Sequence, residues 1–353
     1  MRLATIRRLF TAENADGALL TFLPDVRWAC GFTGSNGLLL VLPDAAHFVS
    51  DGRYASQARA EVEGATVHTP GYDLYGFVAE QAWIPDGARL VVQADHVTLD
   101  AKRTLNERFP AVGLVAKSGF LQEAVAVKTE AEVAKIEAAQ RVTEAVFEEI
   151  VGMLRPGVTE RAIAAEIVYG HLRRGAERMA FEPIVGSGPN GALPHARASE
   201  RVIQSGDLVV LDMGGVLDGY ASDMTRTVAV GEPGEAARHA YAAVLAAQRA
   251  AIRAARAGMR TDELDGVARR VIADAGLGDA FAHGLGHGIG LQTHEWPRVS
   301  YNRQDVLPEG AAVTIEPGVY LEGRFGVRIE DIVVLGADGC RNLTRTPKEL
   351  LIV

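Results

Sequence analysis

The segment FAHGLGHGIGLQTHE, residues 281–295, brings three histidines into one short run: His283, His287 and His294. Glycine occupies alternate positions of this run, at Gly284, Gly286, Gly288 and Gly290. This pattern is unfavourable for a helix, but it allows the backbone to pass close to neighbouring atoms. Because imidazole is a common metal ligand and carries protons near neutral pH, the run is a candidate for metal binding or acid–base chemistry.

Carboxylates form the second group of candidates, because three of them directly follow strand-like runs. VVLD ends on Asp212, VTIE on Glu316 and VRIE on Glu330, and Asp223 lies in SDMTRT on what we expect to be a neighbouring strand. A single acid in this position usually marks a strand that leaves the core, whereas four converging acids need cations to balance them. Two divalent ions would balance four carboxylates. With His287 as a further ligand, the mostly oxygen donor set favours Mn²⁺ over a metal that prefers soft ligands.

Two other motifs lack the context that their chemistry requires. GSGPNG, residues 186–191, matches the dinucleotide-binding pattern G-x-G-x-x-G, but Pro194 stands where a helix should follow. His294-Glu295 begins like the zinc motif H-E-x-x-H, but no second histidine follows at the required spacing. Neither motif predicts a site of its own.

The candidate residues lie in the second half of the chain, where helical and strand-like segments alternate. The periodicity predicts helices near 159–174, 235–257 and 262–275, and strands in DLVVLDMGG, AAVTIEPGVY and GVRIEDIVVL. Upstream, Thr129 and Glu132 have the spacing of a capping box. They predict the start of a helix that ends before Arg155-Pro156-Gly157.

Residues 1–120 have the pattern of a smaller α/β unit. The sequence predicts strands in GALLTFL, GLLLVL, HFVS and RLVVQ, and helices in RYASQARAEVE and LDAKRTLNERF. A chain of 353 residues suggests two or three domains. We place the junction near residues 118–128, which gives domains 1–122 and 123–353 in an α/β (α+β) protein.

The composition disfavours several classes of protein. A net charge of −9 and the lack of a lysine/arginine cluster argue against a nucleic-acid partner. Only two cysteines, Cys30 and Cys340, argue against a disulfide framework and a cysteine-based zinc site. Because neither a signal-length apolar region nor a run of 18 apolar residues is seen, we expect a soluble cytoplasmic protein without a membrane partner.

Together, LDMGG, SDMTRT, HGLGHGIGLQTHE, IEPGVY and VRIED closely resemble the M24-type metallopeptidases with the pita-bread fold. That family includes Xaa-Pro dipeptidase (prolidase), aminopeptidase P and methionine aminopeptidase. The motifs cover residues 181–335, and the resemblance extends over 125–353. CGFTGSNGLLLV and SDGRYASQARAE resemble the creatinase-like N-terminal domain of the Xaa-Pro branch, which methionine aminopeptidases lack. The resemblance therefore implies a creatinase-like α/β domain followed by a catalytic pita-bread domain.

The resemblance also implies a site for two divalent metal ions, with Mn²⁺ expected ahead of Zn²⁺ or Co²⁺. Asp212 would bind the first ion, and His287 and Glu316 would bind the second. Asp223 and Glu330 would bridge both ions. Such a pair of ions can activate a water molecule and polarise a peptide carbonyl.

Further catalytic residues follow from the same resemblance. His195, His283 and His294 match the family's substrate-facing histidines, Arg328 matches its active-site arginine, and Glu316 would act as the base. The alternative for His195 is a turn histidine, and Arg328 could simply pair with a ligand carboxylate. Thr293 departs from the Ile or Val that is usual in the family, which affects only local packing.

The implied function is hydrolysis of Xaa-Pro peptides by a homodimer. A dipeptidase is favoured over an aminopeptidase P, although the motifs do not separate the two. A methionine aminopeptidase is disfavoured by the N-terminal domain, and a metal-free binding scaffold is disfavoured by the full ligand set. A dipeptidase must recognise a free carboxylate after proline, and Arg53 in SDGRYASQ is the candidate cation. The alternative is that Arg53 only pairs with Asp51.

Overall fold

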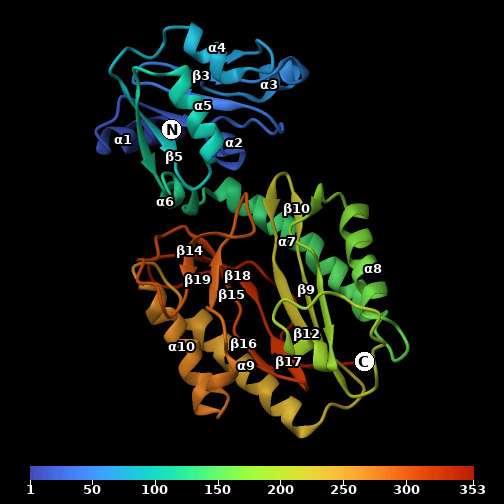
Figure 1. Cartoon of the computed structure of the whole chain (residues 1–353). Helices are drawn as coiled ribbons and strands as arrows, with labels where there is room; N and C mark the ends of the chain where they lie inside the picture. Colours follow the sequence, from blue (N-terminus) through green and yellow to red (C-terminus); the bar gives the residue numbers. More distant parts are fainter. The chain divides into compact units, whose positions relative to one another are not determined.

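The computed structural model describes all 353 residues, which form two compact units, Met1–Val125 and Ala126–Val353 (Figure 1). Both units combine helices with β-sheets, so the α/β class expected from the sequence is confirmed. The boundary that we expected between residues 122 and 123 lies at the start of a short helix, α6 (Gln122–Ala126). No helix in either unit combines the length and the apolar character needed to cross a membrane.

The first unit is built on a six-stranded mixed sheet with the order β4-β3-β2-β1-β5-β6. Its strands are β1 (Gly17–Leu20), β2 (Leu38–Val41), β3 (Ala46–Val49), β4 (Thr66–His68), β5 (Arg89–Gln93) and β6 (Gly113–Lys117). Its helices are α1 (Arg2–Ala12), α2 (Leu23–Cys30), α3 (Ala55–Glu61), α4 (Leu74–Glu80) and α5 (Leu99–Arg108), with a 3-10 turn η1 (Gly52–Tyr54). All residues of β1 and β2 are buried, because helices cover both faces of the sheet.

Three helices of this unit, α1, α2 and α4, were not predicted, and the strand expected in GALLTFL is shorter than its apolar run. The strand ends at Leu20, and the last residue of the run, Leu23, begins α2. Pro24 lies in the first turn of α2, where a missing amide hydrogen costs no helical hydrogen bond. An apolar run alone therefore did not distinguish the end of a strand from the start of a buried helix.

The second unit contains two larger sheets, with the orders β20-β12-β9-β8 and β14-β13-β15-β18-β19. Its strands are β7 (Arg178–Met179), β8 (Ile184–Ser187), β9 (Asp207–Met213), β10 (Gly215–Leu217), β11 (Tyr220–Ala221), β12 (Met224–Val230), β13 (Gly286–Gly288), β14 (Glu295–Val299), β15 (Ala312–Ile315), β16 (Gly318–Leu321), β17 (Phe325–Arg328), β18 (Asp331–Leu335), β19 (Cys340–Asn342) and β20 (Leu351–Ile352). Its helices are α7 (Glu130–Val151), α8 (Glu160–Arg173), α9 (Glu235–Ala254) and α10 (Thr261–Asp274), with 3-10 turns η2 (Gly188–Ala192) and η3 (Gly278–Ala280).

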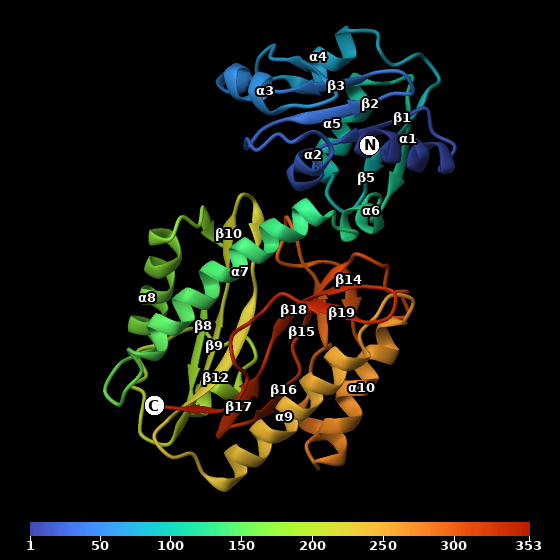
Figure 2. The same cartoon turned by 180° about the vertical axis from the view of Figure 1, so that it is seen from behind.

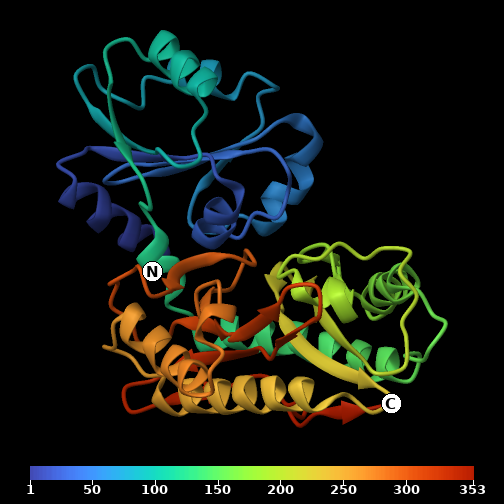
Figure 3. The same cartoon turned by 60° about the horizontal axis from the view of Figure 1, so that its bottom comes forward.

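Each of these sheets is backed by its own pair of helices. Apolar residues of α7 and α8 pack on β8, β9 and β12 in one core, and α7 crosses this sheet in Figure 2. Apolar residues of α9 and α10 pack on β15, β17 and β18 in a second core. Helix α9, drawn in gold, runs along this side of the unit in Figure 3. The helices cover one face of each sheet, so the other face is available to carry a functional site.

Helix α7 begins as the sequence predicted. The Thr129 hydroxyl accepts a hydrogen bond from the Glu132 amide, and the Glu132 carboxylate accepts one from the Thr129 amide. This reciprocal pattern satisfies two amides that have no partner within the helix. The helices expected near 159–174, 235–257 and 262–275 are also confirmed as α8, α9 and α10.

Strands β9 and β12 form an antiparallel pair whose register aligns Asp212 with Thr225. Asp212 lies near the end of β9, and Asp223 directly precedes β12. The expected neighbouring strand is therefore confirmed as β12, and Asp223 is the residue just before it rather than part of it. The segments AAVTIEPGVY and GVRIEDIVVL, each expected as one strand, form two strands each. Glu316 lies between β15 and β16, and Glu330 lies between β17 and β18.

Candidate metal centre and cavity

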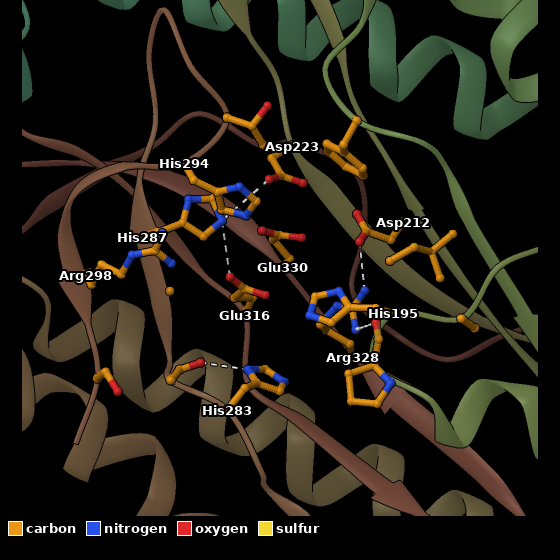
Figure 4. A pocket seen from close by; sticks show the side chains of 18 of the residues that line it. His195, Asp212, Asp223, His283, His287, His294, Arg298, Glu316, Arg328 and Glu330 are labelled. Atoms are coloured by element: carbon orange, nitrogen blue, oxygen red, sulfur yellow. Dashed lines mark hydrogen bonds and ion pairs between the residues drawn. The ribbon is translucent and has the colours of Figure 1, made fainter. Parts of the chain in front are cut away.

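The five residues predicted as metal ligands come together on facing parts of the second unit (Figure 4). His287 Nε2 lies 3.7 Å from Asp223 Oδ2 and 3.4 Å from Glu316 Oε1. Ligand atoms of Asp223, His287 and Glu330 all lie within 4.8 Å of one another. Asp212 lines the same cavity. This set offers four carboxylates and one imidazole to a common space.

The alternating glycines explain how His287 reaches this space. A Cβ atom on Gly286 would overlap the carbonyl oxygen of Thr314, and one on Gly288 would overlap that of Trp296. Strand β13, which carries His287, pairs with β14 on one side and β15 on the other. The missing side chains therefore allow β13 to lie close between its two neighbours.

Each of three ligand side chains is held by a second group. Thr225 Oγ1 donates to Glu330 Oε2 at 2.7 Å, and Thr314 Oγ1 lies 3.2 Å from Glu316 Oε1. His287 Nδ1 lies 3.0 Å from the Gly288 carbonyl oxygen, to which it donates. This leaves the lone pair of His287 Nε2 directed at the carboxylates, which is the arrangement that a metal-binding histidine needs.

The electrostatics of the cluster favour the binding of cations. Burial, with the charges of Glu330 and Asp212, raises the pKa of Asp223 well above its usual value. Burial, with the charge of Glu316, does the same for the pKa of Glu330. Burial raises the pKa of Glu316 to about 7 and lowers that of His287 to about 3. Carboxylates that oppose each other's ionisation while an imidazole stays neutral form a donor set suited to divalent cations.

One atom of the cluster has no partner at all. Asp212 Oδ1 is buried without a hydrogen bond, whereas Asp212 Oδ2 accepts one from Arg328 Nη2 at 2.8 Å. A buried carboxylate oxygen without a partner is costly. The residues present therefore fit a bound metal ion, since that ion would supply the contact that Asp212 Oδ1 lacks.

Arg328 also belongs to a hydrogen-bond chain that includes a predicted histidine. Its Nη1 donates to the Tyr320 hydroxyl at 2.7 Å, and that hydroxyl lies 2.9 Å from His283 Nε2. His283 Nδ1 lies 2.7 Å from the Gly284 carbonyl oxygen, so Nε2 is the acceptor. Burial, with the charge of Arg328, lowers the pKa of His283 to about 4, which keeps the ring neutral.

A cavity of about 700 Å³ opens above the cluster. His195 and His294 line it with exposed side chains, as does Arg298 on β14. The ring of His294 lies edge-on to that of His287, with 4.4 Å between the ring centres. Thr293, the departure from the expected Ile or Val, donates its hydroxyl proton to the Ala180 carbonyl at 3.0 Å.

Arg53, the candidate for carboxylate recognition, lies in the first unit. Its Nε and Nη2 donate to the two carboxylate oxygens of Asp51 at 2.8 and 2.9 Å. The ion pair with Asp51, which is the alternative role expected for Arg53, is thus present. The Arg53 side chain is 58% exposed, so this pairing still leaves part of the guanidinium accessible.

Sequence reasoning missed two residues of this site, Arg298 and Tyr320. Arg298 is the cavity residue opposite His287 in the pairing of β13 with β14, and it has no ion pair in the structure. The alternation of polar and apolar residues around β14 could have indicated that Arg298 faces away from the core. Tyr320 lies in the quoted GVY motif and could have been weighed as a hydrogen-bond partner.

The two discarded motifs have structural roles instead. GSGPNG forms the end of β8 and the turn η2, with no helix after it. Gly191 and Gly326 approach each other so closely that a Cβ atom on Gly326 would overlap the Gly191 carbonyl. Glu295 is not a ligand of the cluster and forms a buried ion pair with Lys128.

A buried cluster of carboxylates and imidazole beneath an open cavity, between two helix-backed sheets, defines a metal-dependent hydrolase with the pita-bread fold. Comparison with known proteins agrees. Residues 134–337 match metallopeptidase family M24, and residues 2–127 match the creatinase/prolidase N-terminal domain. The chain therefore belongs to metallopeptidase family M24.

Individual relatives share most of the architecture. The chain is 45% identical over 225 residues to a Xaa-Pro dipeptidase of Pyrococcus furiosus. The aligned segment covers 64% of this chain and 65% of that protein. A solved Xaa-Pro dipeptidase from Bacillus anthracis is 36% identical, has a TM-score of 0.96 and covers 100% of this chain and 99% of its own. An X-Pro aminopeptidase from Thermotoga maritima MSB8 is 35% identical, has a TM-score of 0.91 and covers 98% of this chain and 100% of its own.

Proposed function

We propose that the protein is a Xaa-Pro dipeptidase that uses two divalent metal ions, with manganese as the first candidate. The observation that carries the proposal is the group of four carboxylates and one imidazole beneath a cavity that also contains an unpaired guanidinium. The proposed ligands are Asp212, Asp223, His287, Glu316 and Glu330. The names of the relatives support the dipeptidase over the aminopeptidase.

Different residues of the chain would have different roles in peptide hydrolysis. The bound ions would supply Lewis-acid activation of the substrate carbonyl and of water. The Glu316 carboxylate would take a proton from the attacking water and pass it to the leaving proline nitrogen. His195 and His294 would donate hydrogen bonds to the oxygen of the tetrahedral intermediate. His283 and Arg328 would form walls for the proline ring.

The decisive experiment compares a Xaa-Pro dipeptide with a Xaa-Pro-Yaa tripeptide, with Mn²⁺ added. A dipeptidase should have the higher kcat/KM on the dipeptide. Equal or better cleavage of the tripeptide would show an aminopeptidase instead, and no cleavage of either would refute the Xaa-Pro assignment. Repeating the assay with Zn²⁺ and Co²⁺ identifies the preferred metal.

The substrate carboxylate should be recognised by a cation in the cavity. Arg298 meets this requirement, because it lines the cavity and its guanidinium has no carboxylate partner. Replacing Arg298 with methionine should lower kcat/KM on a Xaa-Pro dipeptide by an amount that corresponds to about 1.5–3 kcal/mol of lost transition-state stabilisation. The loss on the corresponding dipeptide amide should be much smaller. A loss of the same size on both substrates would assign Arg298 to another role.

Arg53 remains the second candidate for this recognition. If Arg53 binds the C-terminal carboxylate of the dipeptide, Arg53→Ala should weaken hydrolysis of the dipeptide and leave hydrolysis of the tripeptide unchanged. Because Arg53 also neutralises the buried Asp51, the melting temperature of the variant must be measured alongside. Equal losses on both substrates with a lower melting temperature would assign Arg53 to folding.

Relative to a Glu316→Gln variant, the metal-free protein should lose stability as the pH rises from about 4.3 to about 7. In the folded state burial raises the pKa of Glu316 to about 7, whereas a carboxyl of an unfolded chain titrates near 4.3. Between these two values the folded protein binds a proton that the unfolded chain has released. The stability that this proton gives is therefore fully present below about pH 4.3 and is lost progressively until the pH has passed about 7. Burial lowers the pKa values of His283 and His287 to about 4 and 3, whereas a histidine of an unfolded chain titrates near 6.5, so these rings add stability as the pH rises to about 7. Both the wild type and Glu316→Gln carry these rings, so the comparison removes their contribution.

Calorimetry with a chelator and with Mn²⁺ checks this expectation. The increase in melting temperature on adding Mn²⁺ should become larger between pH 6.5 and 8, because protons no longer compete with the metal. Glu316→Gln cannot ionise, so the melting temperature of the metal-free wild type should fall relative to that of metal-free Glu316→Gln between about pH 4.3 and about 7. A difference between the two melting temperatures that stays constant over this range would contradict the expectation.

We also propose a homodimer, as the family resemblance implied. Light scattering at micromolar concentration should give twice the mass of one chain, which is 37.6 kDa. A monomer mass would overturn this part of the proposal without affecting the peptidase assignment.

A further inference from the structure

A buried ion pair that the proposed chemistry does not use lies next to His294. Lys128 Nζ is 2.8 Å from Glu295 Oε2, and the two side chains are only 2% and 4% exposed. Glu295 directly follows His294, which lines the cavity. The pair is therefore one residue away from a proposed donor to the reacting oxygen.

The ion pair connects the loop of His294 to a distant part of the chain. Lys128 Nζ also lies 3.2 Å from the Ala126 carbonyl, and the Lys128 amide donates to the Gly310 carbonyl at 2.9 Å. Glu295 Oε1 accepts a hydrogen bond from the Gln292 amide at 3.1 Å. Both carboxylate oxygens of Glu295 are thus engaged, one by the ammonium group and one by the loop that leads to His294.

Gly290 shows how tightly the loop packs on this pair. A Cβ atom at Gly290 would lie 2.7 Å from Lys128 Cε and 2.8 Å from Glu295 Oε2. The Gly290 carbonyl accepts a hydrogen bond from the Ala221 amide at 2.7 Å. The loop is therefore fixed on one side by the ion pair and on the other by the segment that leads to Asp223.

Stability alone does not explain two buried charges in this place. Apolar residues of similar size often stabilise a protein as well as a buried ion pair does, whereas charge-assisted hydrogen bonds fix the direction of the groups that they join. We propose that Lys128 and Glu295 are positioning residues that hold the imidazole of His294 in its catalytic orientation. This inference rests on the proposed function, in which His294 stabilises the reacting oxygen.

The test uses the double variant Lys128→Met/Glu295→Gln in the full chain. Each single replacement should lower the melting temperature, because it leaves an unpaired buried group. The double variant leaves no unpaired buried charge, so it should recover most of the melting temperature lost in the single variants and the full metal content. Its kcat should stay lower by on the order of 10–100-fold, with KM little changed. In a His294→Ala background the same double replacement should cause no further loss of kcat.

Two controls separate this inference from its alternatives. Arg201→Met/Asp207→Asn removes a partly buried ion pair whose residues do not line the cavity, and it should leave kcat unchanged. Imidazole NMR signals, assigned through His294→Ala, should show that the double variant shifts or broadens His294 and not His239. This second readout does not depend on activity, so it tests the inference even if the wild-type protein fails to cleave Xaa-Pro dipeptides.

The outcomes are distinct. Wild-type kcat in a stable double variant with unchanged His294 signals would overturn the positioning role. An additive loss of kcat in the His294→Ala background would also overturn it, because the pair would then act through another residue. Recovered stability with a persistent, His294-dependent loss of kcat supports it.

Discussion

Replacing Asp223 or Glu330 with alanine is expected to abolish metal binding and activity together. Both carboxylates are buried in the cluster around His287 and would be shared by two ions. Loss of either leaves fewer charges to balance two divalent ions, and the Lewis-acid contribution to catalysis, several kcal/mol, disappears with the metal. Metal analysis of the purified variants and kcat/KM on a Xaa-Pro dipeptide measure the two effects side by side.

The matched control for these variants is Glu322→Ala, which removes an exposed carboxylate from the turn between β16 and β17. It should keep the metal content and turnover of the wild type. An Asp223 or Glu330 variant with full metal content and near-normal turnover would refute the ligand assignment. A variant that loses turnover but keeps both ions would retain the site and assign the residue to a later step.

Replacing His294 with alanine should have the second largest effect. The metal content should stay complete, because His294 is not among the proposed ligands, and kcat should fall by 10²–10³-fold, about 2.7–4 kcal/mol. Although the ring is open to the cavity, partial burial by the cavity wall, with the charge of Arg298, lowers the pKa of His294, so the ring is a neutral hydrogen-bond donor at neutral pH. Steady-state kinetics and metal analysis are the measurements.

His239→Ala is the control, since His239 is exposed and bonds only to the Ala275 carbonyl. The kinetic pattern decides between two roles for His294. A lower kcat with a similar KM indicates stabilisation of the transition state, whereas a raised KM with unchanged kcat indicates uniform substrate binding and contradicts our assignment.

The sequence predicted the centre of the second unit well, because chemistry and secondary structure coincide there. Asp212, Glu316 and Glu330 each stand at or beside the end of a β-branched run, so one pattern locates both the strand and the ligand. Helices α8, α9 and α10 have regular apolar periodicity, and α7 begins with a capping box that depends only on local residues.

Other parts of the molecule could not be predicted in this way. The burial of β1 on both faces removes the alternation that identifies a strand, and the apolar run continues into α2. Arg298 is an isolated arginine whose importance depends on which side of β14 faces the cavity. Lys128 and Glu295 are 167 residues apart, so no local pattern links them. Long-range contacts of this kind are specified only by the folded chain.

The alternating glycines of the β13 segment have a consequence for how the enzyme should lose activity on heating. A glycine has more conformational freedom in the unfolded chain than any other residue, at a cost of about 0.5–1 kcal/mol relative to alanine. Gly284, Gly286, Gly288 and Gly290 therefore contribute little rigidity themselves, and the order of this segment comes from the residues that surround it. Strand β13 is mostly buried and paired with β14 on one side and β15 on the other, so it should stay ordered for as long as these neighbours do. Heat should therefore release the backbone that carries His287 only when this sheet opens, and catalysis should fail together with the unfolding of the second unit.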